Sequence, residues 1–347
     1  MSDTDISIRE VGRTGRITLA RPKALNALTY EMSLDIETAL DRWRSDGDID
    51  LILIDAEGEK AFCAGGDLSR LYKTGTAGDF GFGRKFWADE YRLNAKIANC
   101  PVPFAAIMDG FVMGGGVGVS AHGSCRVVTE RSVVAMPECG IGLAPDVGGT
   151  WLLAQAPGHL GEFLGITGWH MNGADAIFAG FADCFVPGDR LEKLKAALES
   201  QAATTVLDDY ISEPETAPVA RHLETLDRYF GQSTLRDCIA SLENDPSEFA
   251  QKAAAMARKV CPLSAACAFE MVRRARNFSS VEEALSQEYR FTYRSMSDGQ
   301  FLEGVRALIV DKDRQPQWRP TRIEGVTDEM VERMLAPLGD DELRLEG

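Results

Sequence analysis

The sequence predicts an α/β protein whose first half builds a mostly parallel sheet and whose second half is helical. Short apolar runs suited to buried strands recur between helical stretches up to Pro187. Strands separated by helices need crossover connections, and such connections give parallel sheets. Helical periodicity then continues almost without interruption. We therefore expect a core over residues 1–190 and a helical region over residues 191–347.

Alternating and helical patterns predict the elements of the first half. Ile6–Val11 and Gly15–Ala20 alternate apolar and polar residues around a Gly-Arg-Thr-Gly turn, which favours a hairpin. A helix is expected over Thr29–Arg44, with Thr29 as its N-cap because a hydroxyl can accept a hydrogen bond from the first turn. Buried strands are expected at Leu51–Asp55, Val102–Met108, Cys125–Thr129 and Phe181–Val186.

The second half carries a series of helical patterns and one linker. The linker is Ser212–Pro218, which is rich in Glu, Thr and Pro. Helices are expected at Leu191–Ser200, Val219–Phe230, Leu235–Glu243, Pro246–Val260, Pro262–Arg276, Val281–Ser297 and Gln300–Val310.

Charge excludes some classes of partner. Lysine and arginine number 37 against 53 aspartates and glutamates, which gives a net charge of −16. Nucleic acids and anionic membrane surfaces require a broad positive field, so we expect neither as a partner. The longest apolar runs, such as Val102–Met108, fall well short of the ~20 residues of a membrane-spanning helix.

The N-terminus and the cysteines predict a cytoplasmic protein. Met1–Glu10 is polar and acidic and has no pattern of a signal peptide or transit segment. The eight cysteines contain no Cys-x-x-Cys pair and mostly lie among apolar neighbours, which indicates reduced thiols. Cysteines and histidines lack the spacing of a metal site, so no metal is expected.

Three glycine-containing clusters follow predicted strands. Glycine lets a backbone turn sharply or approach a ligand closely. One such cluster alone would indicate a tight loop between a strand and a helix, whereas three in this order favour a ligand site. The clusters are Phe62–Asp67, Gly110–Gly118 and Met136–Gly149.

Together with Arg21–Leu28, these clusters resemble the crotonase (enoyl-CoA hydratase/isomerase) superfamily. The resemblance implies a spiral of ββα units followed by a helical trimerisation region, with an acyl-CoA thioester as the ligand. It also implies that the backbone N–H groups of Gly66 and Gly115 form an oxyanion hole. Fixed N–H dipoles in a dry site stabilise the negative charge that develops on a carbonyl oxygen under attack. A helix expected over Gly116–His122 would add its dipole at Gly115.

The carboxylates indicate which reaction of the superfamily to expect. Hydratases resemble one another in carrying a glutamate at the position of Gly118 and another at that of Glu138. Here Gly118 has no side chain, and Asp146 stands where hydratases have a small residue. This combination is similar to the hydrolases of the superfamily that cleave short 3-hydroxyacyl-CoA thioesters in valine catabolism. Further matches to these hydrolases are Phe86–Tyr91, Met113–His122, Glu303–Asp313 and Pro316–Pro320.

The resemblance also implies a role for each site residue. Glu138 attacks the thioester carbonyl or deprotonates a water molecule, and Asp146 orients or protonates the reacting groups. Glu90 accepts a hydrogen bond from the substrate 3-hydroxyl, although its helical position also fits a solvated face. Coenzyme A is part of the substrate, so no separate cofactor is expected. The residues expected to bind it are Lys23, Ala24, Leu25, Ala64 and Gly65.

Other interpretations stay open. Asp146 could instead cap a helix beginning near Gly149, Asp67 could brace the first oxyanion loop, and His122 could be a packed residue. The chain could be an enoyl-CoA hydratase or isomerase with Asp146 as its second acid, or an acyl-CoA-binding protein without activity. The trimerisation region of the superfamily is compatible with a homo-oligomer.

Overall fold

The computed structural model describes residues 5–45 and 47–345. Contacts divide the chain into two compact units, each assembled from three separate segments. The first unit holds the described part of Met1–Asp67 with Asp89–Ala135 and His170–Ala220, and the second holds Leu68–Ala88, Met136–Trp169 and the described part of Arg221–Gly347. The boundary expected at residue 190 stays a prediction, and residues 191–220 group with the sheet.

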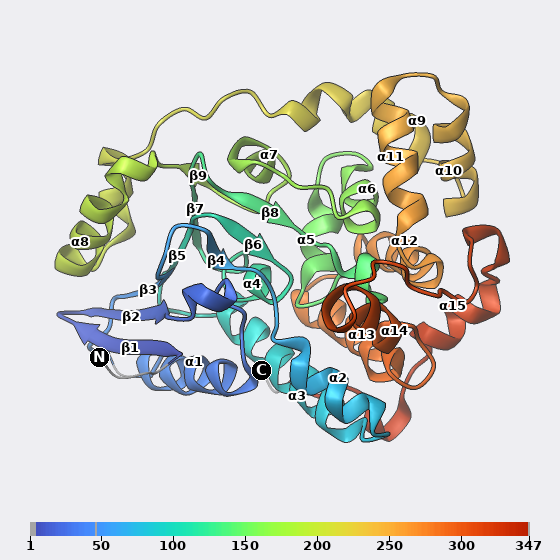
Figure 1. Cartoon of the computed structure of the whole chain (residues 1–347). Coiled ribbons are helices and arrows are strands. Elements are labelled where there is room, and N and C mark those ends of the chain that lie inside the picture. The colour runs from blue at the N-terminus through green and yellow to red at the C-terminus, as the bar shows by residue number, and fades with distance from the viewer. Residues whose placement is uncertain (1–4, 46, 346–347) are drawn as a thin grey trace. The chain divides into compact units, whose positions relative to one another are not determined.

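A six-stranded sheet forms the frame of the first unit. A hairpin of β1 and β2 begins it, with Ile8 paired to Ile17, and all later neighbours pair in parallel. The predicted hairpin and parallel sheet are therefore confirmed. Figure 1 shows α1 beside the hairpin. In spatial order the strands are β1 (Ile6–Val11), β2 (Thr14–Leu19), β3 (Leu51–Ala56), β5 (Phe104–Met108), β7 (Cys125–Val128) and β9 (Cys184–Phe185).

A second, smaller parallel sheet lies in the same unit. Its strands are β4 (Ala61–Cys63), β6 (Phe111–Met113) and β8 (Val133–Ala135). Each follows one long strand along the chain, so β3–β4, β5–β6 and β7–β8 repeat the same strand pair. The three glycine clusters begin at or beside these short strands.

Helices cover and cap the sheet of the first unit. The helix α1 (Tyr30–Trp43) begins as expected, because Thr29 Oγ1 accepts a hydrogen bond of 3.1 Å from Met32 N. The helix α8 (Leu191–Gln201) places Leu194 and Leu198 in the core beside Leu53 and Val127. Other helical elements of this unit are α4 (Gly115–Gly118), α7 (Gly173–Phe178) and the 3-10 turns Pro22–Ala24, Gly188–Arg190 and Thr204–Asp209. The 3-10 turn Pro218–His222 has its first residues in this unit and its last two in the second.

The second unit is helical, as the sequence predicts for most of it. Two expected helices are shorter: Val219–Phe230 becomes a 3-10 turn followed by α9, and Gln300–Val310 becomes α14 followed by a π-turn at Arg306–Val310. Figure 1 shows α9, α10 and α11 packed together. The helices are α2 (Leu68–Thr76), α5 (Gly149–Gln155), α6 (Leu160–Thr167), α9 (Leu223–Phe230), α10 (Leu235–Asn244), α11 (Glu248–Lys259), α12 (Pro262–Ala275), α13 (Val281–Ser295), α14 (Phe301–Val305) and α15 (Asp328–Leu335).

The helix α3 (Gly81–Ala98) contributes its first residues to the second unit and its later residues, from Asp89 on, to the first. Among the described helices, none has the length and apolarity needed to cross a bilayer. All eight cysteines are free thiols.

Candidate functional site

Three residues expected to handle the thioester carbonyl and the acyl group lie together in the first unit. Gly66 follows β4, Gly115 opens α4 and Glu90 projects from α3. A Cβ atom built on Gly115 would lie 3.5 Å from Gly66 N and 3.0 Å from Glu90 Oε1. The two glycines expected to donate N–H groups are therefore neighbours, with a carboxylate beside them.

The helix that begins at Gly115 is much shorter than expected. The sequence predicts a helix over Gly116–His122, but α4 ends at Gly118. This prediction is wrong because glycine is a poor helix former and three of the four residues of α4 are glycine. Close packing requires this composition, since a Cβ on Gly116 would lie 2.2 Å from Cys63 O. A four-residue helix has only a small macrodipole. Stabilisation of an oxyanion at Gly115 would therefore depend on the positions of the individual N–H groups.

The segment Arg21–Leu28 pairs with the first glycine cluster. Leu28 N donates to Gly65 O at 2.8 Å, and Ala64 N donates to Leu25 O at 3.0 Å. This pairing brings together the residues expected to bind coenzyme A, which are Lys23, Ala24, Leu25, Ala64 and Gly65. Arg21 fixes the end of the loop, because its Nη2 lies 3.2 Å from Asp67 Oδ2. Asp67 thus braces the loop, as one of the interpretations above expects.

Asn26 organises the same segment and was missed by the sequence analysis. It is 1% exposed, and its Oδ1 accepts from Arg21 N at 2.8 Å. Its Nδ2 donates to Glu57 O at 2.9 Å and to Ala61 O at 2.8 Å. Asn26 has a φ of +54°, a left-handed conformation that asparagine tolerates better than most residues. The sequence feature that could have indicated its role is a single asparagine between apolar residues in a turn.

Glu90 is buried rather than placed on a solvated face. It is 4% exposed, and the adjacent Asp89 accepts hydrogen bonds from Tyr30 Oη at 2.5 Å and from Arg92 Nη1 at 2.9 Å. Burial, with the Glu90 carboxylate nearby, raises the pKa of the Cys63 thiol to about 12. The thiol is therefore protonated at neutral pH and is no nucleophile there.

Glu138 and Asp146, the residues expected to be catalytic, both lie in the second unit and are both buried. Glu138 opens the 3-10 turn Glu138–Ile141 and is 5% exposed, and Asp146 is 6% exposed. Burial, and then the charge of Asp146, raises the pKa of Glu138 well above its ordinary value. Glu138 Oε2 has no hydrogen-bond partner among the described residues. Glu138 therefore keeps its proton to a higher pH than an exposed glutamate does.

Asp146 is not the N-cap of the following helix. The helix α5 has Gly148 as its N-cap residue, with no capping side chain of its own. The backbone of Asp146 takes part in the turn instead, because Gly149 N donates to Asp146 O at 2.7 Å.

Glu288 is another buried carboxyl group of the second unit, and it is not among the residues predicted from the sequence. It projects from α13, is 0% exposed and accepts hydrogen bonds from Gly148 and Thr150. Burial raises its pKa to about 8, and the charge of Asp146 acts in the same direction. Glu288 lies on the face of α13 that includes the buried residues Val281, Ala284 and Leu285. A glutamate on an apolar helix face was the signal that could have found it.

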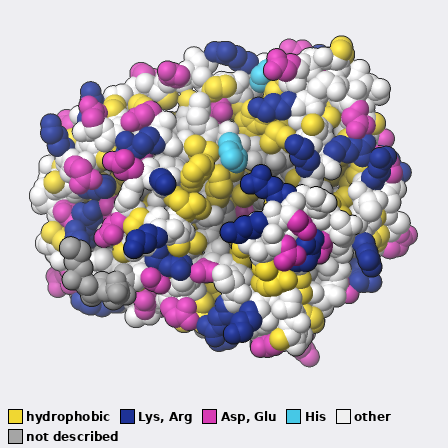
Figure 2. Space-filling view, viewed as in Figure 1, with side chains coloured by type: hydrophobic (Ala, Val, Ile, Leu, Met, Phe, Trp, Pro, Cys, Tyr) yellow, Lys and Arg dark blue, Asp and Glu magenta, His cyan; other side chains and the backbone are white. Residues whose placement is uncertain are grey.

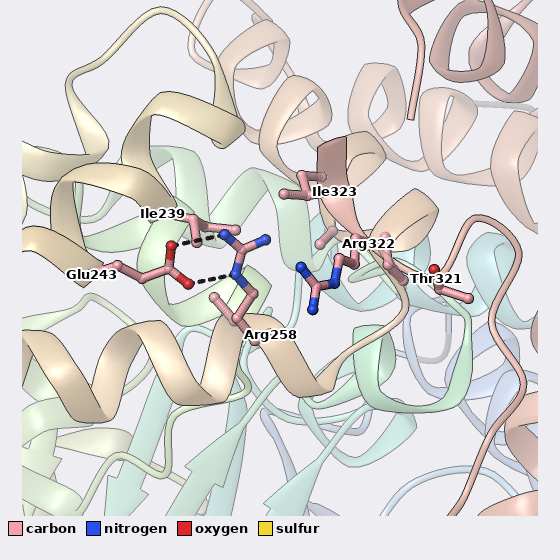
Figure 3. Close-up of a pocket in the computed structure, with 9 residues that line it drawn as sticks. Ile239, Glu243, Arg258, Thr321, Arg322 and Ile323 are labelled. Atoms are coloured by element: carbon pink, nitrogen blue, oxygen red, sulfur yellow. Dashed lines mark hydrogen bonds and ion pairs between the residues drawn. The ribbon is translucent and has the colours of Figure 1, made fainter. Parts of the chain in front are cut away.

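The cavity shown in Figure 3 lies in the second unit and is distinct from the candidate site. Its volume is about 410 Å³, and Arg258, Arg322 and Glu243 are among its lining residues. Arg258 donates to both carboxylate oxygens of Glu243, at 2.7 and 2.9 Å, and to Glu324 at 2.7 Å. These contacts occupy the Arg258 guanidinium, and no residue expected at the active site lines this cavity. Within residues 5–45 and 47–345, no group of three His, Cys, Asp or Glu side chains could hold a metal ion.

The surface mixes both signs of charge. Acidic and basic side chains are interspersed over the face drawn in Figure 2. Lysine and arginine side chains are therefore available to an anionic ligand locally, although the net charge of the chain is −16.

A family model described as enoyl-CoA hydratase/isomerase matches residues 14–335. The chain belongs to the enoyl-CoA hydratase/isomerase family. Among its relatives, 3-hydroxyisobutyryl-CoA hydrolase of Gallus gallus is 37% identical, over 99% of this chain and 92% of the relative. The enzyme of the same name from Homo sapiens is 36% identical, over 98% of this chain and 90% of the relative.

Solved structures confirm the expected fold class of this enoyl-CoA hydratase/isomerase family member. An enoyl-CoA hydratase from Rhodobacter sphaeroides is 47% identical with a TM-score of 0.92, over 98% of this chain and 100% of that one. A carnitinyl-CoA dehydratase from Mycobacterium thermoresistibile is 41% identical with a TM-score of 0.95, over 99% of this chain and 100% of that one. Family membership supports an acyl-CoA ligand, and a homo-oligomer stays a prediction.

The cytoplasmic localisation expected from the sequence is contradicted. The hydrolases from Gallus gallus, Danio rerio, Rattus norvegicus and Homo sapiens are all named as mitochondrial proteins. The expectation rested on the polar residues Met1–Glu10 and on reduced thiols, and reduced thiols do not distinguish one reducing compartment from another.

Proposed function

We propose that this protein hydrolyses 3-hydroxyisobutyryl-CoA to 3-hydroxyisobutyrate and coenzyme A, a step of valine degradation. The observation that carries the proposal is the buried pair of Glu138 and Asp146, combined with Gly118 at the position where hydratases have a carboxylate. Relatives with that hydrolase name, 36–38% identical over nearly the whole chain, support it.

In this proposal the N–H groups of Gly66 and Gly115 receive the carbonyl oxygen of the thioester as it becomes an oxyanion. A preorganised pair of donors stabilises that charge. Glu90 accepts a hydrogen bond from the 3-hydroxyl of the acyl group. A substrate without this hydroxyl would leave a buried acceptor unpaired, and that penalty gives specificity.

Glu138 has two routes for the acyl transfer. As a nucleophile it forms a mixed anhydride while the carbon–sulfur bond breaks, and water then opens the anhydride. As a base it takes a proton from the water that attacks the thioester directly. In both routes Asp146 orients the reacting groups or supplies the proton to the departing thiolate. Nearby carboxyl groups separate each other's pKa values, which permits one acid and one base at the same pH.

A hydratase is the second candidate, because the two similar solved structures are described as a hydratase and a dehydratase. One experiment separates the candidates: release of thiol from 3-hydroxyisobutyryl-CoA is compared with hydration of crotonyl-CoA by the same preparation. We expect rapid thiol release and negligible hydration. Hydration as fast as thiol release would establish the hydratase, and neither activity would favour an acyl-CoA-binding protein.

A further inference from the structure

The turn between Asp146 and α5 has a strained backbone. Val147 has a φ of +54°, and Gly148 follows with a φ of +77°. A β-branched residue rarely adopts this left-handed conformation, because its Cβ atom crowds the backbone carbonyl. The Val147 side chain is also buried, at 1% exposure. Such a conformation persists only where the surroundings hold it in place.

Glu288, from a distant part of the sequence, stabilises this turn by hydrogen bonds. Its Oε2 accepts from Gly148 N at 2.7 Å, and its Oε1 accepts from Thr150 N at 2.9 Å and from Thr150 Oγ1 at 2.5 Å. Gly148 has no side chain to cap α5, so the Glu288 carboxyl group serves the free N–H groups of the first turn. Both carboxyl oxygens are used, and both bonds to backbone lie within four residues of Asp146.

We infer that Glu288 is a positioning residue for Asp146, which holds the turn from Asp146 to Thr150 in the conformation that orients the Asp146 carboxylate. This inference rests on the proposed function, because Asp146 has a reaction to serve only if the protein hydrolyses a thioester. The contacts also explain why the residue is an acid. In its ionised form the carboxyl group offers an acceptor to each of two backbone N–H groups, whereas an amide would turn its own NH₂ toward one of them.

Glu288→Gln is the main test, and Glu162→Gln is its matched control. Glu162 is also 0% exposed in the second unit, but its carboxylate binds the Arg276 side chain, at 2.6 Å. We expect Glu288→Gln to lower kcat for 3-hydroxyisobutyryl-CoA by about 10- to 100-fold, the loss typical of a displaced catalytic group, with KM changed by less than about threefold. Glu162→Gln should lower Tm and leave kcat unchanged when both variants are assayed well below their Tm.

Thr150 gives a second, gentler test that does not depend on the folding of Glu288→Gln. Thr150→Val removes one hydrogen bond to Glu288 and keeps the side-chain volume, and we expect kcat to fall by about 2- to 10-fold. Thr150→Ser retains the hydroxyl and should restore kcat. Equal kcat in these two variants, or a Glu288→Gln loss no larger than that of Glu162→Gln, would overturn the positioning role while wild-type hydrolysis stands. Absence of thiol release by the wild type would overturn the proposed function and the inference with it.

Discussion

A methyl group added at Gly115 tests the oxyanion hole while it leaves both N–H donors in the chain. The Cβ atom of Gly115→Ala would lie 3.5 Å from Gly66 N and 3.0 Å from Glu90 Oε1. The first distance places the methyl group beside a donor assigned to the substrate oxygen. The second is shorter than ordinary van der Waals contact, so the Glu90 carboxylate must move by a few tenths of an ångström. The methyl group therefore obstructs the site without a clash against backbone.

The expected loss follows from the value of one oxyanion donor. The methyl group keeps the carbonyl oxygen away from a donor, and loss of one such hydrogen bond costs about 2.7–4 kcal/mol of transition-state stabilisation, or about 10²–10³-fold in kcat. We expect Gly115→Ala to fall in this range in a thiol-release assay with 3-hydroxyisobutyryl-CoA. Thermal unfolding checks that the fold is retained. The matched control is Gly81→Ala at the exposed start of α3, where the added Cβ meets only Asp79 Oδ1, at 3.3 Å.

A folded Gly115→Ala protein with wild-type kcat would refute the assignment of Gly115 to the oxyanion hole. Loss of activity with a large fall in Tm would instead show a packing defect. Gly116→Ala provides that comparison, because its Cβ would lie 2.2 Å from Cys63 O and must disturb the backbone.

Three further predictions concern the carboxyl groups. Glu138→Gln should reduce kcat by about 10³-fold with acyl-CoA binding retained in a titration, and weakened binding with unchanged kcat would contradict its catalytic role. Asp146→Asn should lose most hydrolytic activity and should not hydrate crotonyl-CoA. If the wild type hydrates crotonyl-CoA and the variant loses that activity, the protein is a hydratase. Burial raises the pKa of Glu288 to about 8 and that of Glu138 above its ordinary value, so the folded state retains protons that the unfolded state has lost. For Glu288 the free energy of unfolding should therefore fall between about pH 5 and pH 8, by up to about 1.4 kcal/mol per pH unit, and Glu138 should act in the same direction. Glu288→Gln should flatten this slope in denaturant titrations.

Sequence patterns predicted the elements whose signal is local. The helix α1 with its Thr29 cap and the strand β3 lie within a residue or so of their expected bounds, because helical spacing, a cap and an apolar run all act over a few residues. The strands β4, β6 and β8 have three residues each, which is too few for an alternating pattern to register.

The features that could not be predicted from the sequence depend on tertiary contacts. The early end of α4 reflects close approach to Cys63, and the role of Glu288 depends on a turn 140 residues earlier in the chain. Neither contact leaves a mark in the spacing of neighbouring residues. The resemblance pointed to Gly66, Gly115 and Glu90, which lie side by side in the structure, whereas the geometry of the turn at Val147 came only from the structure.

The interleaved segments of the two units have a consequence for biosynthesis. The edge strand β9 pairs with β7 across more than fifty intervening residues, and the core of the sheet needs Leu194 and Leu198 from α8. About 200 residues must therefore be synthesised before the first unit can complete its core. The segment Met136–Trp169 belongs to a unit whose other helices are synthesised later still. During that interval apolar strands are exposed and prone to aggregate. We expect a fragment ended at residue 190 to be insoluble, and the nascent chain to engage chaperones until α8 has emerged.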